Sequence, residues 1–437
     1  MKNITIIGTG YVGLVTGAGL SEFGNKVICA DINNDKILNI NAGNIPIYEP
    51  GLEEIVKRNV QNNRLFFSSN IASSIKNSEV VVIAVGTPQS DSGKADMQYI
   101  YSVVNAIKDN LNGYKVICTK STVPIGTGKK ITDILKNNFK ENSDFNYVSN
   151  PEFLREGSAV KDFLWPDRII IGTSSLIAYE MMCDIYRPLY INKSPINHTS
   201  VETAEMIKYA SNSFLALKIS YINEIANLCE LVGADVHDVA SAMGKDGRIS
   251  GKFLHPGPGF GGSCFPKDLE SLSSISDEHG AQMDTLSAAI TANKKQKKQM
   301  CNKLEKLVAT GIKDKVITVL GLSFKANTDD IRESPSIDII KYILSKGGHV
   351  RAYDPIANDA MSVLFPNISY FQNVYEAIDK AEALIVMTEW NEFRSLDLEK
   401  IKNIMIGKFI LDTRNILNMK ELSSLGFVYD NIGRLKI

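Results

Sequence analysis

With 437 residues, 44% of them hydrophobic and 22% charged, the chain has the composition of an ordinary folded protein of two or three domains. Its formal net charge of −1 provides no basic field that would attract nucleic acid or an anionic membrane. The six cysteines form no CxxC pair and the five histidines show no metal-binding spacing, so we expect a reduced protein without a metal site. The chain opens without a signal-peptide pattern, and its apolar runs are far shorter than the roughly 20 residues of a membrane helix; we expect a cytoplasmic protein.

The first part of the chain alternates short apolar runs with helical patterns, which predicts a mostly parallel sheet covered by helices. The predicted strands are Ile4–Ile7, Lys26–Ile32, Glu79–Val85, Lys115–Lys120 and Asn146–Val148. The turns after the third and fourth of these strands are VGTP and KSTVP. In open α/β sheets, ligands bind at such carboxyl ends of strands, although turn-forming Gly and Pro explain part of each segment without any function.

The first strand runs into a GxGxxG motif, GTGYVG, ahead of a helical pattern. Gly8 would permit the tight turn, Gly10 would let the backbone approach a pyrophosphate, and Gly13 would let helix pack on strand. Asp31 ends the second strand, where a carboxylate reaches the ribose hydroxyls and repels the extra phosphate of NADP. The pattern predicts an NAD-binding Rossmann-like domain, which we place at residues 1–196; the alternative for Asp31 is a solvated strand end.

Two carboxylates follow the last of these strands in the segment NPEFLREG. Glu152 and Glu156 are four residues apart, so a helical turn would put both on one face, and one of them could act as a general base for water. A pair of this kind is more often an ordinary solvated surface.

Residues 201–232 contain neither Gly nor Pro and carry apolar residues at helical spacing, which predicts one long helix. Because it is apolar on more than one side, it is either a subunit interface or a central core helix. Lys208 and Asn212 are four residues apart on it, so a cation and an amide could together hold an oxygen that develops negative charge; ordinary helix surface is the alternative. We place a central helical domain at residues 197–298.

The glycine-rich segment GPGFGGSCFPKD is the most informative stretch of this central domain. Its glycines allow backbone to approach a ligand closely. Cys264 follows them in a loop and is itself followed by Lys267 and Asp268; a nearby cation favours the thiolate, which is the nucleophilic form. A loop thiol with no role is the alternative.

From Lys315 the strand pattern restarts, which predicts a second α/β domain at residues 299–437. The expected strands are Lys315–Leu320, His349–Tyr353, Ala383–Met387 and Lys408–Leu411. The turn after the first of them lacks the glycine fingerprint, but cations such as Lys325 and Arg332 follow it. They could bind phosphate or the cofactor, or they could simply form surface ion pairs. The expected fold class is therefore α/β, with two Rossmann-like parallel-sheet domains joined by a helical domain with a long central helix.

Taken together, these segments resemble the UDP-glucose/GDP-mannose dehydrogenase family, and within it the UDP-glucose 6-dehydrogenases. The ordered set is far more specific than any one motif, and it spans nearly the whole chain. The motifs are GTGYVGLVTG, VGTP, KSTVPIGT, NPEFLREGSAVKDF, PDRIIIG, AEMIKYASNSFLALKISYINEIA, GFGGSCFPKDL and GLSFKANTDDIRESPS.

The resemblance implies a four-electron, NAD-dependent oxidation of UDP-glucose to UDP-glucuronate, a product used in polysaccharide biosynthesis. The implied catalytic residues are Cys264, Lys208, Asn212, Asp268, Glu152 and Thr122. Lys208 and Asn212 would hold the developing alkoxide, with a water near Thr122. Cys264 would carry a thiohemiacetal and then a thioester, and Glu152 or Asp268 would activate the hydrolytic water.

The resemblance also implies binding residues. Those for NAD are Gly8, Gly10, Val12, Gly13, Asp31, Lys36, Thr87, Thr122, Glu156, Lys267 and Arg332. Those for the nucleotide sugar are Phe153, Leu154, Arg155, Glu156, Lys208, Asn212, Arg248, Phe253, Leu254, His255, Pro256, Gly257, Gly261 and Lys325. Arg248 would reach the substrate of a neighbouring subunit, because the family forms dimers through the long helix. We expect a homodimer or a larger homo-oligomer.

Several related functions compete with this prediction. GDP-mannose dehydrogenases share the GGSC loop and are the nearer alternative, whereas UDP-N-acetylmannosamine dehydrogenases usually carry GGHC. A one-step hydroxyacid dehydrogenase also uses a Lys and an Asn on a central helix, but it needs neither Cys264 nor a second α/β domain. A non-catalytic NAD-binding sensor would show no turnover with any nucleotide sugar.

Overall fold

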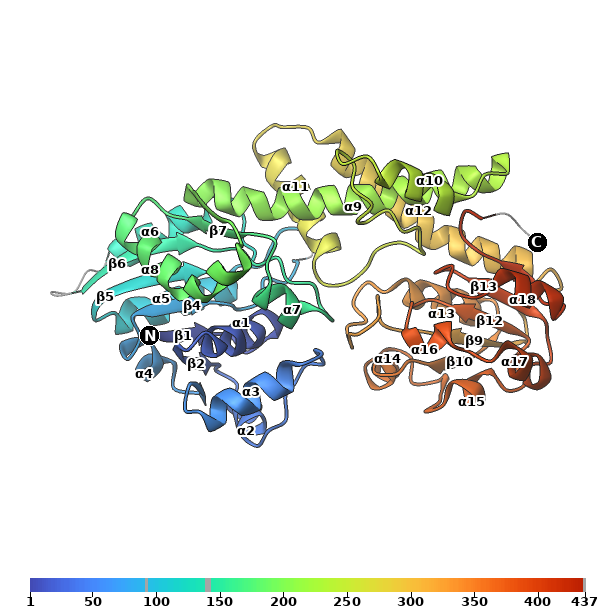
Figure 1. The fold of residues 1–437 in the computed structure, drawn as a ribbon, viewed down its shortest axis with the longest axis horizontal. Helices are drawn as coiled ribbons and strands as arrows, with labels where there is room; N and C mark the ends of the chain where they lie inside the picture. Colours follow the sequence, from blue (N-terminus) through green and yellow to red (C-terminus); the bar gives the residue numbers. More distant parts are fainter. Residues whose placement is uncertain (91–92, 138–142, 435–437) are drawn as a thin grey trace. The chain divides into compact units, whose positions relative to one another are not determined.

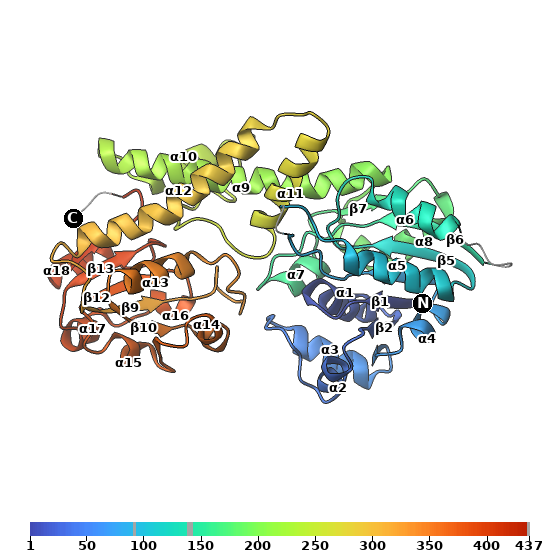
Figure 2. The same ribbon diagram turned by 180° about the vertical axis from the view of Figure 1, so that it is seen from behind.

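The computed structural model describes residues 1–90, 93–137 and 143–434, with the side chain of Ser143 excepted. The chain divides into two compact units. The first comprises residues 1–211 and 270–279, and the second comprises residues 212–269 and 280–437. Each unit contains one sheet (Figures 1 and 2).

The sheet of the first unit has eight strands in the order β3-β2-β1-β4-β5-β6-β7-β8. All neighbouring strands are parallel except β6 and β7, which pair antiparallel. The strand order reverses between β1 and β4, and this is the point at which doubly wound sheets bind nucleotides. The strands are β1 (Asn3–Ile7), β2 (Lys26–Ala30), β3 (Leu65–Ser68), β4 (Val80–Ile83), β5 (Gly113–Thr119), β6 (Ser143–Ser149), β7 (Ile169–Gly172) and β8 (Ile196–Thr199).

Apolar cores cover both faces of this sheet, because alternate residues of its strands point to opposite sides. Ile4 and Ile6 belong to the core under α1, α3, α7 and α8, whereas Ile7, Val81 and Ile83 belong to the core under α4, α5 and α6. The helices are α1 (Tyr11–Glu22), α2 (Asn34–Asn41), α3 (Leu52–Gln61), α4 (Ile71–Lys76), α5 (Gln98–Asn110), α6 (Thr127–Lys136), α7 (Ala159–Leu164) and α8 (Leu176–Ile185), with a 3₁₀ helix η1 (Arg187–Asn192).

Helix α9 (Val201–Val232) is continuous over 32 residues, as the sequence predicts from the absence of Gly and Pro. It contributes its first eleven residues to the first unit and the remainder to the second. Helix α11 (Phe265–Glu278) is likewise shared between the two units, whereas α10 (Val236–Gly244) and α12 (Asp284–Leu307) belong to the second.

The sheet of the second unit has six strands, all parallel, in the order β11-β10-β9-β12-β13-β14. This repeats the order of the first sheet, with its own reversal between β9 and β12. The strands are β9 (Val316–Leu320), β10 (His349–Tyr353), β11 (Ser369–Tyr370), β12 (Ala383–Val386), β13 (Phe409–Asp412) and β14 (Val428–Asp430). The helices are α13 (Pro335–Ser345), α14 (Asn358–Leu364), α15 (Val374–Ile378), α16 (Asn391–Arg394), α17 (Leu398–Ile404) and α18 (Met419–Ser424).

The predicted fold class is confirmed: two parallel-sheet units of Rossmann type occur together with a helical region around the long α9. Each strand expected from the sequence is present, with ends that differ by up to three residues. The strands that the sequence analysis missed are β3, β7, β8, β11 and β14. Most of these lie at or near a sheet edge, where strands are short and their apolar pattern is weak.

Candidate functional site

The glycine turn after β1 lets the backbone of helix α1 pack closely against the sheet, because its glycines have no side chains. Gly8 has φ +105°, and a Cβ there would lie 2.7 Å from the Ala84 carbonyl oxygen. A Cβ on Gly13 would lie 1.8 Å from the Gly8 oxygen, whereas a Cβ on Gly10 would meet nothing within 4 Å. Packing therefore requires Gly8 and Gly13, while the open space at Gly10 leaves room for a pyrophosphate.

Asp31, just past the end of β2, is anchored to this turn. Its Oδ2 accepts hydrogen bonds from the Thr9 amide at 2.9 Å and the Thr9 hydroxyl at 2.7 Å, and Lys36 lies 3.6 Å away. Burial alone would raise the pKa of this carboxyl, but the hydrogen bonds from Thr9 and Asn33 and the charge of Lys36 hold the pKa below its ordinary value. Val12, in the first turn of α1, packs against the core below. The glycine turn fits the pyrophosphate of NAD, and the Asp31 carboxylate fits its ribose.

The loops after β4 and β5 contact each other beside this turn. The buried Thr87 hydroxyl donates to the Thr122 carbonyl oxygen at 2.9 Å. The second loop is held further along by Glu205 of α9, whose carboxylate accepts from the Gly126 amide at 2.6 Å and the Gly128 amide at 2.8 Å. Burial outweighs these bonds and raises the pKa of Glu205 to about 7.

Glu49 is a buried residue that the sequence analysis missed. Its carboxylate accepts hydrogen bonds from the Tyr11 hydroxyl, from the Gly157 amide at 2.6 Å and from the Ala159 amide at 2.7 Å. It thereby ties the first turn of α1, which lies within the glycine motif, to the loop that carries Glu156. Burial raises the pKa of Glu49, although the bonds it accepts oppose that shift. Since its partners lie 38 and more than 100 residues away, no local pattern could have identified it.

Glu152 forms a buried ion pair with Lys208, 2.9 Å between Oε1 and Nζ. Its other oxygen accepts the Leu154 amide at 2.5 Å. The helical turn expected through Glu152 and Glu156 is wrong, because residues 150–155 are not helical. Pro151 disfavours a helical conformation at Asn150. The hydrogen bond from the Leu154 amide to the Glu152 carboxylate competes with the backbone hydrogen bonds of a helix.

The residues that follow Glu152 differ in their surroundings. The guanidinium carbon of Arg168 lies 3.8 Å from the centre of the Phe153 ring, and the Lys208 ammonium lies 5.4 Å from the same ring centre. Arg155 instead makes a two-pronged pair with Asp162 on the surface, at 2.6 and 2.9 Å. Phe153 therefore lies beside the ion pair of Lys208 and Glu152, whereas Arg155 is paired with Asp162 at the surface.

In the second unit, a carboxylate, an amide and a cation form another buried cluster. The Asn212 amide donates to Asp268 Oδ2 at 2.6 Å, and the Lys267 ammonium donates to Oδ1 at 2.7 Å. The Asp268 side chain is 1% exposed, so it lies inside the protein with both oxygens bonded. On α9, Lys208 and Asn212 are thus one turn apart, and each contacts a different carboxylate.

Cys264 is the residue immediately before α11, and its thiol is partly exposed. Its carbonyl oxygen accepts the Asp268 amide at 2.9 Å, which begins the helix, and the Ser263 hydroxyl lies 3.6 Å from Sγ. The N-terminus of a helix favours negative charge, as a nucleophilic thiolate requires.

The loop before Cys264 is held by buried amide side chains. Gly257 accepts from Gln296 and donates to Asn223, each at 2.8 Å, and Phe260 exchanges two hydrogen bonds with Asn293. A Cβ on Gly261 would lie 2.2 Å from the Glu333 carbonyl oxygen. The glycine at 261 is therefore required by the approach of another backbone segment.

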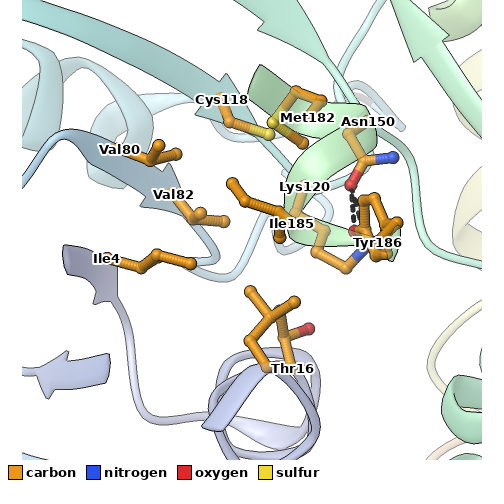
Figure 3. A pocket seen from close by; sticks show the side chains of 11 residues that line it. Ile4, Thr16, Val80, Val82, Cys118, Lys120, Asn150, Met182, Ile185 and Tyr186 are labelled. Atoms are coloured by element: carbon orange, nitrogen blue, oxygen red, sulfur yellow. Dashed lines mark hydrogen bonds between the residues drawn. The ribbon is translucent and has the colours of Figure 1, made fainter. Parts of the chain in front are cut away.

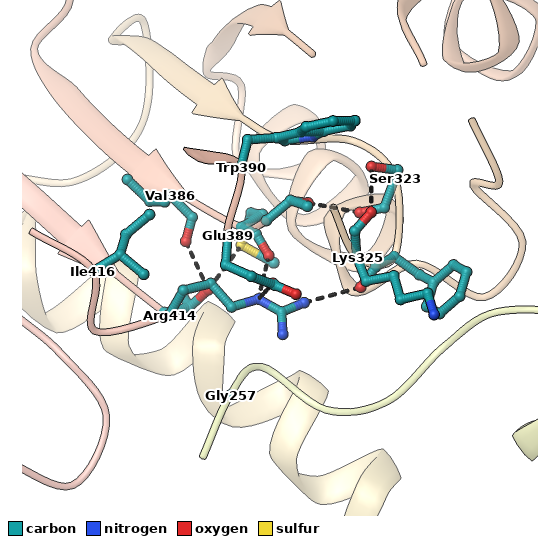
Figure 4. A network of polar contacts seen from close by, with 12 residues as sticks. Gly257, Ser323, Lys325, Val386, Glu389, Trp390, Arg414 and Ile416 are labelled. Atoms are coloured by element: carbon teal, nitrogen blue, oxygen red, sulfur yellow. Dashed lines mark hydrogen bonds and ion pairs between the residues drawn. The ribbon is translucent and has the colours of Figure 1, made fainter. Parts of the chain in front are cut away.

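A second polar cluster lies at the reversal point of the second sheet (Figure 4). Arg414, just past β13, donates to the Met387 carbonyl oxygen at 2.8 Å and the Phe324 carbonyl oxygen at 3.0 Å, and it pairs with Glu389 at 3.1 Å. Its Nη1 would lie 3.2 Å from a Cβ on Gly257. Arg414 was missed in the sequence, although its position after a parallel strand matches the rule that found Asp31.

Of the other residues implied by the resemblance, Lys325 belongs to the cluster around Arg414 (Figure 4), and Arg248 and Arg332 are at the surface. Lys325 has its ammonium 5.3 Å from the Phe324 ring, and the side chains of Arg248 and Arg332 are 90% and 64% exposed and pair with Asp246 and Asp330. Phe253 has a positive φ of 64° and begins the segment whose Leu254 is buried, followed by His255 and Pro256.

No helix in residues 1–90, 93–137 and 143–434 is long and apolar enough to cross a membrane. No group of three or more His, Cys, Asp or Glu side chains in those same ranges is placed to hold a metal ion.

Three family profiles match successive parts of the chain. Residues 2–190 match the NAD-binding domain of the UDP-glucose/GDP-mannose dehydrogenase family, residues 202–295 its central domain, and residues 318–419 its UDP-binding domain.

Curated relatives and a solved structure agree with these profiles. The chain is 46% identical over 435 residues to UDP-glucose 6-dehydrogenase TuaD of Bacillus subtilis, covering 99% of this chain and 94% of the relative. It is 45% identical over 434 residues to UDP-glucose 6-dehydrogenase of Rhizobium meliloti, covering 99% of each. A UDP-glucose dehydrogenase from Pyrobaculum islandicum superimposes with a TM-score of 0.92 at 33% identity, covering 100% of this chain and 98% of that one.

The predicted family, enzyme class and cofactor are therefore confirmed. The chain belongs to the UDP-glucose/GDP-mannose dehydrogenase family of NAD-dependent oxidoreductases.

Proposed function

We propose that the protein oxidises UDP-glucose to UDP-glucuronate in two steps, with Cys264 as the covalent nucleophile. The observation that carries this proposal is the position of Cys264. A partly exposed thiol stands at the N-terminus of α11, four residues before the buried Asp268 that Asn212 and Lys267 hold. A one-step alcohol dehydrogenase has no use for such a thiol.

NAD supplies the oxidant and accepts one hydride in each oxidation. We propose that the pyrophosphate and ribose of NAD bind at the glycine turn, Asp31, Lys36 and the contact between Thr87 and Thr122. Glu156, Lys267 and Arg332 are proposed as further contacts on the strength of the family resemblance.

In the first oxidation, the C6 alcohol loses a hydride and a proton and becomes an aldehyde. The Lys208 ammonium would stabilise the alkoxide that forms as the proton leaves, and Asn212 would donate to the same oxygen; a water near Thr122 would take part. Glu152, bonded to Lys208 at 2.9 Å, keeps that cation in place.

In the second oxidation, the Cys264 sulfur adds to the aldehyde carbon and forms a thiohemiacetal. Loss of a second hydride and of the hydroxyl proton gives a thioester. Water then breaks the carbon–sulfur bond, releasing the carboxylic acid and restoring the thiol. We propose Glu152 or Asp268 as the base for this water, since each is a buried carboxylate next to a lysine.

For the nucleotide sugar, we propose that the second sheet binds the diphosphate. Lys325 and Arg414 supply cations beside its reversal point, next to Gly257. The remaining substrate contacts that we propose are Phe153, Leu154, Arg155, Glu156, Phe253, Leu254, His255, Pro256 and Gly261. The three domains proposed are residues 1–196, 197–298 and 299–437.

We also propose a cytoplasmic homodimer, or a larger assembly, built through α9. Three large apolar side chains of this helix, Phe214, Tyr221 and Leu228, are exposed at intervals of seven residues. Seven residues are close to two helical turns, so these side chains form one stripe, which a second copy could cover. Arg248, 90% exposed, would then be available to the partner's substrate.

The stoichiometry of the reaction tests this function. About two NADH should form for each nucleotide sugar consumed, measured by absorbance with UDP-glucose and, for comparison, GDP-mannose and N-acetylated UDP-sugars. A value near one would support a one-step hydroxyacid-type dehydrogenase instead. Faster turnover of GDP-mannose would assign the chain to the other branch of the family.

Replacement of the thiol tests its covalent role. Cys264→Ser should lower the rate of acid formation by about 1,000-fold or more, the order seen when a covalent nucleophile is removed. Cys183→Ser, which changes the other partly exposed thiol, is the control and should keep the full rate. Normal acid formation by Cys264→Ser would remove the thiol from the mechanism.

A further inference from the structure

Lys120 is a buried lysine to which the proposed reaction gives no role. It follows β5 directly and is 5% exposed. Its ammonium has two acceptors among the described residues, Asn150 Oδ1 at 3.2 Å and the Tyr186 hydroxyl oxygen at 3.4 Å. An ammonium has three protons to donate, so one of them lacks an acceptor from the described part of the chain.

A small cavity lies next to these groups (Figure 3). Its volume is about 10 Å³, and apart from Lys120, Asn150, Tyr186 and Thr16 its lining is apolar. Thr16, on α1, is 1% exposed, and its hydroxyl has no hydrogen-bond partner in the described residues. The space is about that of one water molecule, and two of the polar groups around it have hydrogen-bonding capacity to spare.

The positive charge of Lys120 also favours a water molecule in the cavity. Among the described residues, no carboxylate oxygen lies within ion-pair distance of its ammonium. Burial lowers the pKa of Lys120, and the nearby Lys208 adds to that shift, while Glu152 opposes it. A water bonded to the ammonium would replace part of the hydration that burial removes.

Asn150 links this lysine to the proposed base. Its side chain accepts from Lys120 and from the Tyr186 hydroxyl at 2.6 Å, and it donates to the Ile170 carbonyl oxygen at 2.7 Å. Only Pro151 separates Asn150 from Glu152, and proline has a fixed φ. The hydrogen bonds of Asn150 thus anchor the start of the segment that carries Glu152.

We propose that the cavity holds one ordered water, bonded to the Lys120 ammonium and the Thr16 hydroxyl, and that this hydrated lysine positions the loop of Glu152. Lys120 is thus a positioning residue, acting through Asn150. The positioning role of Lys120 rests on the proposed role of Glu152, whereas the presence of the water is independent of it.

The water is tested by thermal unfolding of Thr16→Val. In a hydrated cavity, valine removes a partner of the water, so the unfolding midpoint should fall. In a dry cavity, valine removes a buried hydroxyl that bonds nothing, so the midpoint should rise, and this would overturn the proposal. Thr173→Val is the matched control, because the buried Thr173 hydroxyl donates to the Tyr147 carbonyl oxygen at 2.8 Å; its midpoint should fall. A crystal structure should also show density at the site.

The positioning role is tested with two lysines of the same region. Lys120→Met should lower kcat at least tenfold and change KM for NAD less than twofold. Lys115→Met is the matched control: Lys115 of β5 is 2% exposed and donates to the Ser78 carbonyl oxygen at 2.5 Å, at the other end of the strand. It should lose stability but keep kcat within twofold.

Two outcomes of that experiment would overturn the positioning role: full kcat in Lys120→Met, or an equal loss of kcat in both lysine variants. If Lys120→Met does not accumulate as folded protein, Tyr186→Phe removes the other donor to Asn150 and should also lower kcat. Glu152→Gln is measured in parallel. If that variant keeps full activity, the proposed role of Glu152 is wrong; if it fails while Lys120→Met is normal, only the present inference is wrong.

Discussion

Asp31 and Glu205 are two carboxylates of the first unit whose pKa values move in opposite directions. Burial raises the pKa of both, but the bonds to Asp31 from Thr9 and the charge of Lys36 are enough to reverse the shift. Glu205 also accepts two backbone amides, yet no cation of the described residues pairs with it, and its pKa rises to about 7. The result is one carboxylate that is ionised throughout the physiological range and another that titrates within it.

The lowered pKa and fixed position of Asp31 lead to a prediction about cofactor choice. Asp31→Asn keeps the size of the side chain but removes its charge. The kcat/KM ratio for NAD over NADP should fall about tenfold or more, in line with the 1.5–3 kcal/mol of a hydrogen bond to a charged group. Steady-state kinetics with both cofactors provides the measurement, and an unchanged ratio would mean that another residue contacts the ribose.

Glu205 leads to a prediction about pH and stability. Its pKa is 4.5 ordinarily and about 7 in the folded protein, so the folded state binds the proton more tightly. The stability that this proton contributes is complete below pH 4.5 and is lost as the pH rises through 7. Between those limits, the free energy of unfolding should fall by up to about 3 kcal/mol relative to Glu205→Gln. Denaturant unfolding of both proteins across this range is the test; parallel pH curves would contradict it.

At the scale of elements, helices and strands were more predictable than the contacts between them. Helix α9 could be predicted as one long helix because Gly and Pro are absent from it, and Asp31 could be found because the end of a strand follows a local pattern. Glu49 could not, since its partners lie 38 and more than 100 residues away along the chain. Arg414 was missed although it follows a parallel strand, the same local position that identified Asp31. The i, i+4 spacing of Glu152 and Glu156 did not correspond to a helical turn, because spacing alone ignores the hydrogen bond from the Leu154 amide to the Glu152 carboxylate.

The exposed stripe of α9 leads to a prediction about assembly. Replacing Tyr221 and Leu228 together by glutamate should shift the protein from dimer to monomer, because burying two charges against an apolar partner surface is costly. Light scattering after size-exclusion chromatography measures the mass. Val363→Glu makes the same kind of change at an 81% exposed position of α14 and should leave the mass unaltered. An unaltered mass for the α9 variant would place the interface elsewhere.

At the scale of the whole molecule, the same strand order occurs twice, and each sheet has its own reversal point. The first has the glycine turn that lets a helix N-terminus meet a pyrophosphate. The second keeps a glycine with positive φ, Gly321, directly after β9, and it has the cations Arg414 and Lys325 nearby. In the proposed function, the same architecture would offer backbone amides to one diphosphate and cationic side chains to the other.

This division predicts two separable effects of ligands on stability. NAD and UDP should each raise the unfolding midpoint, since a ligand at 100 times its Kd adds about 2.7 kcal/mol to the folded state. Lys325→Gln should remove most of the shift with UDP and keep the shift with NAD. Asp31→Asn should do the reverse. Thermal scans with each ligand test this, and loss of both shifts in either variant would contradict it.

The placement of the six cysteines has a practical consequence for following the reaction. Cys29, Cys118, Cys229 and Cys301 are buried, and burial raises the pKa of Cys29 and Cys118 to about 12, so an alkylating reagent has only Cys183 and Cys264 within reach in the folded protein. Peptide mass spectrometry during turnover would therefore test the proposed acylation of Cys264, with Cys183 serving as the internal standard for labelling in every sample.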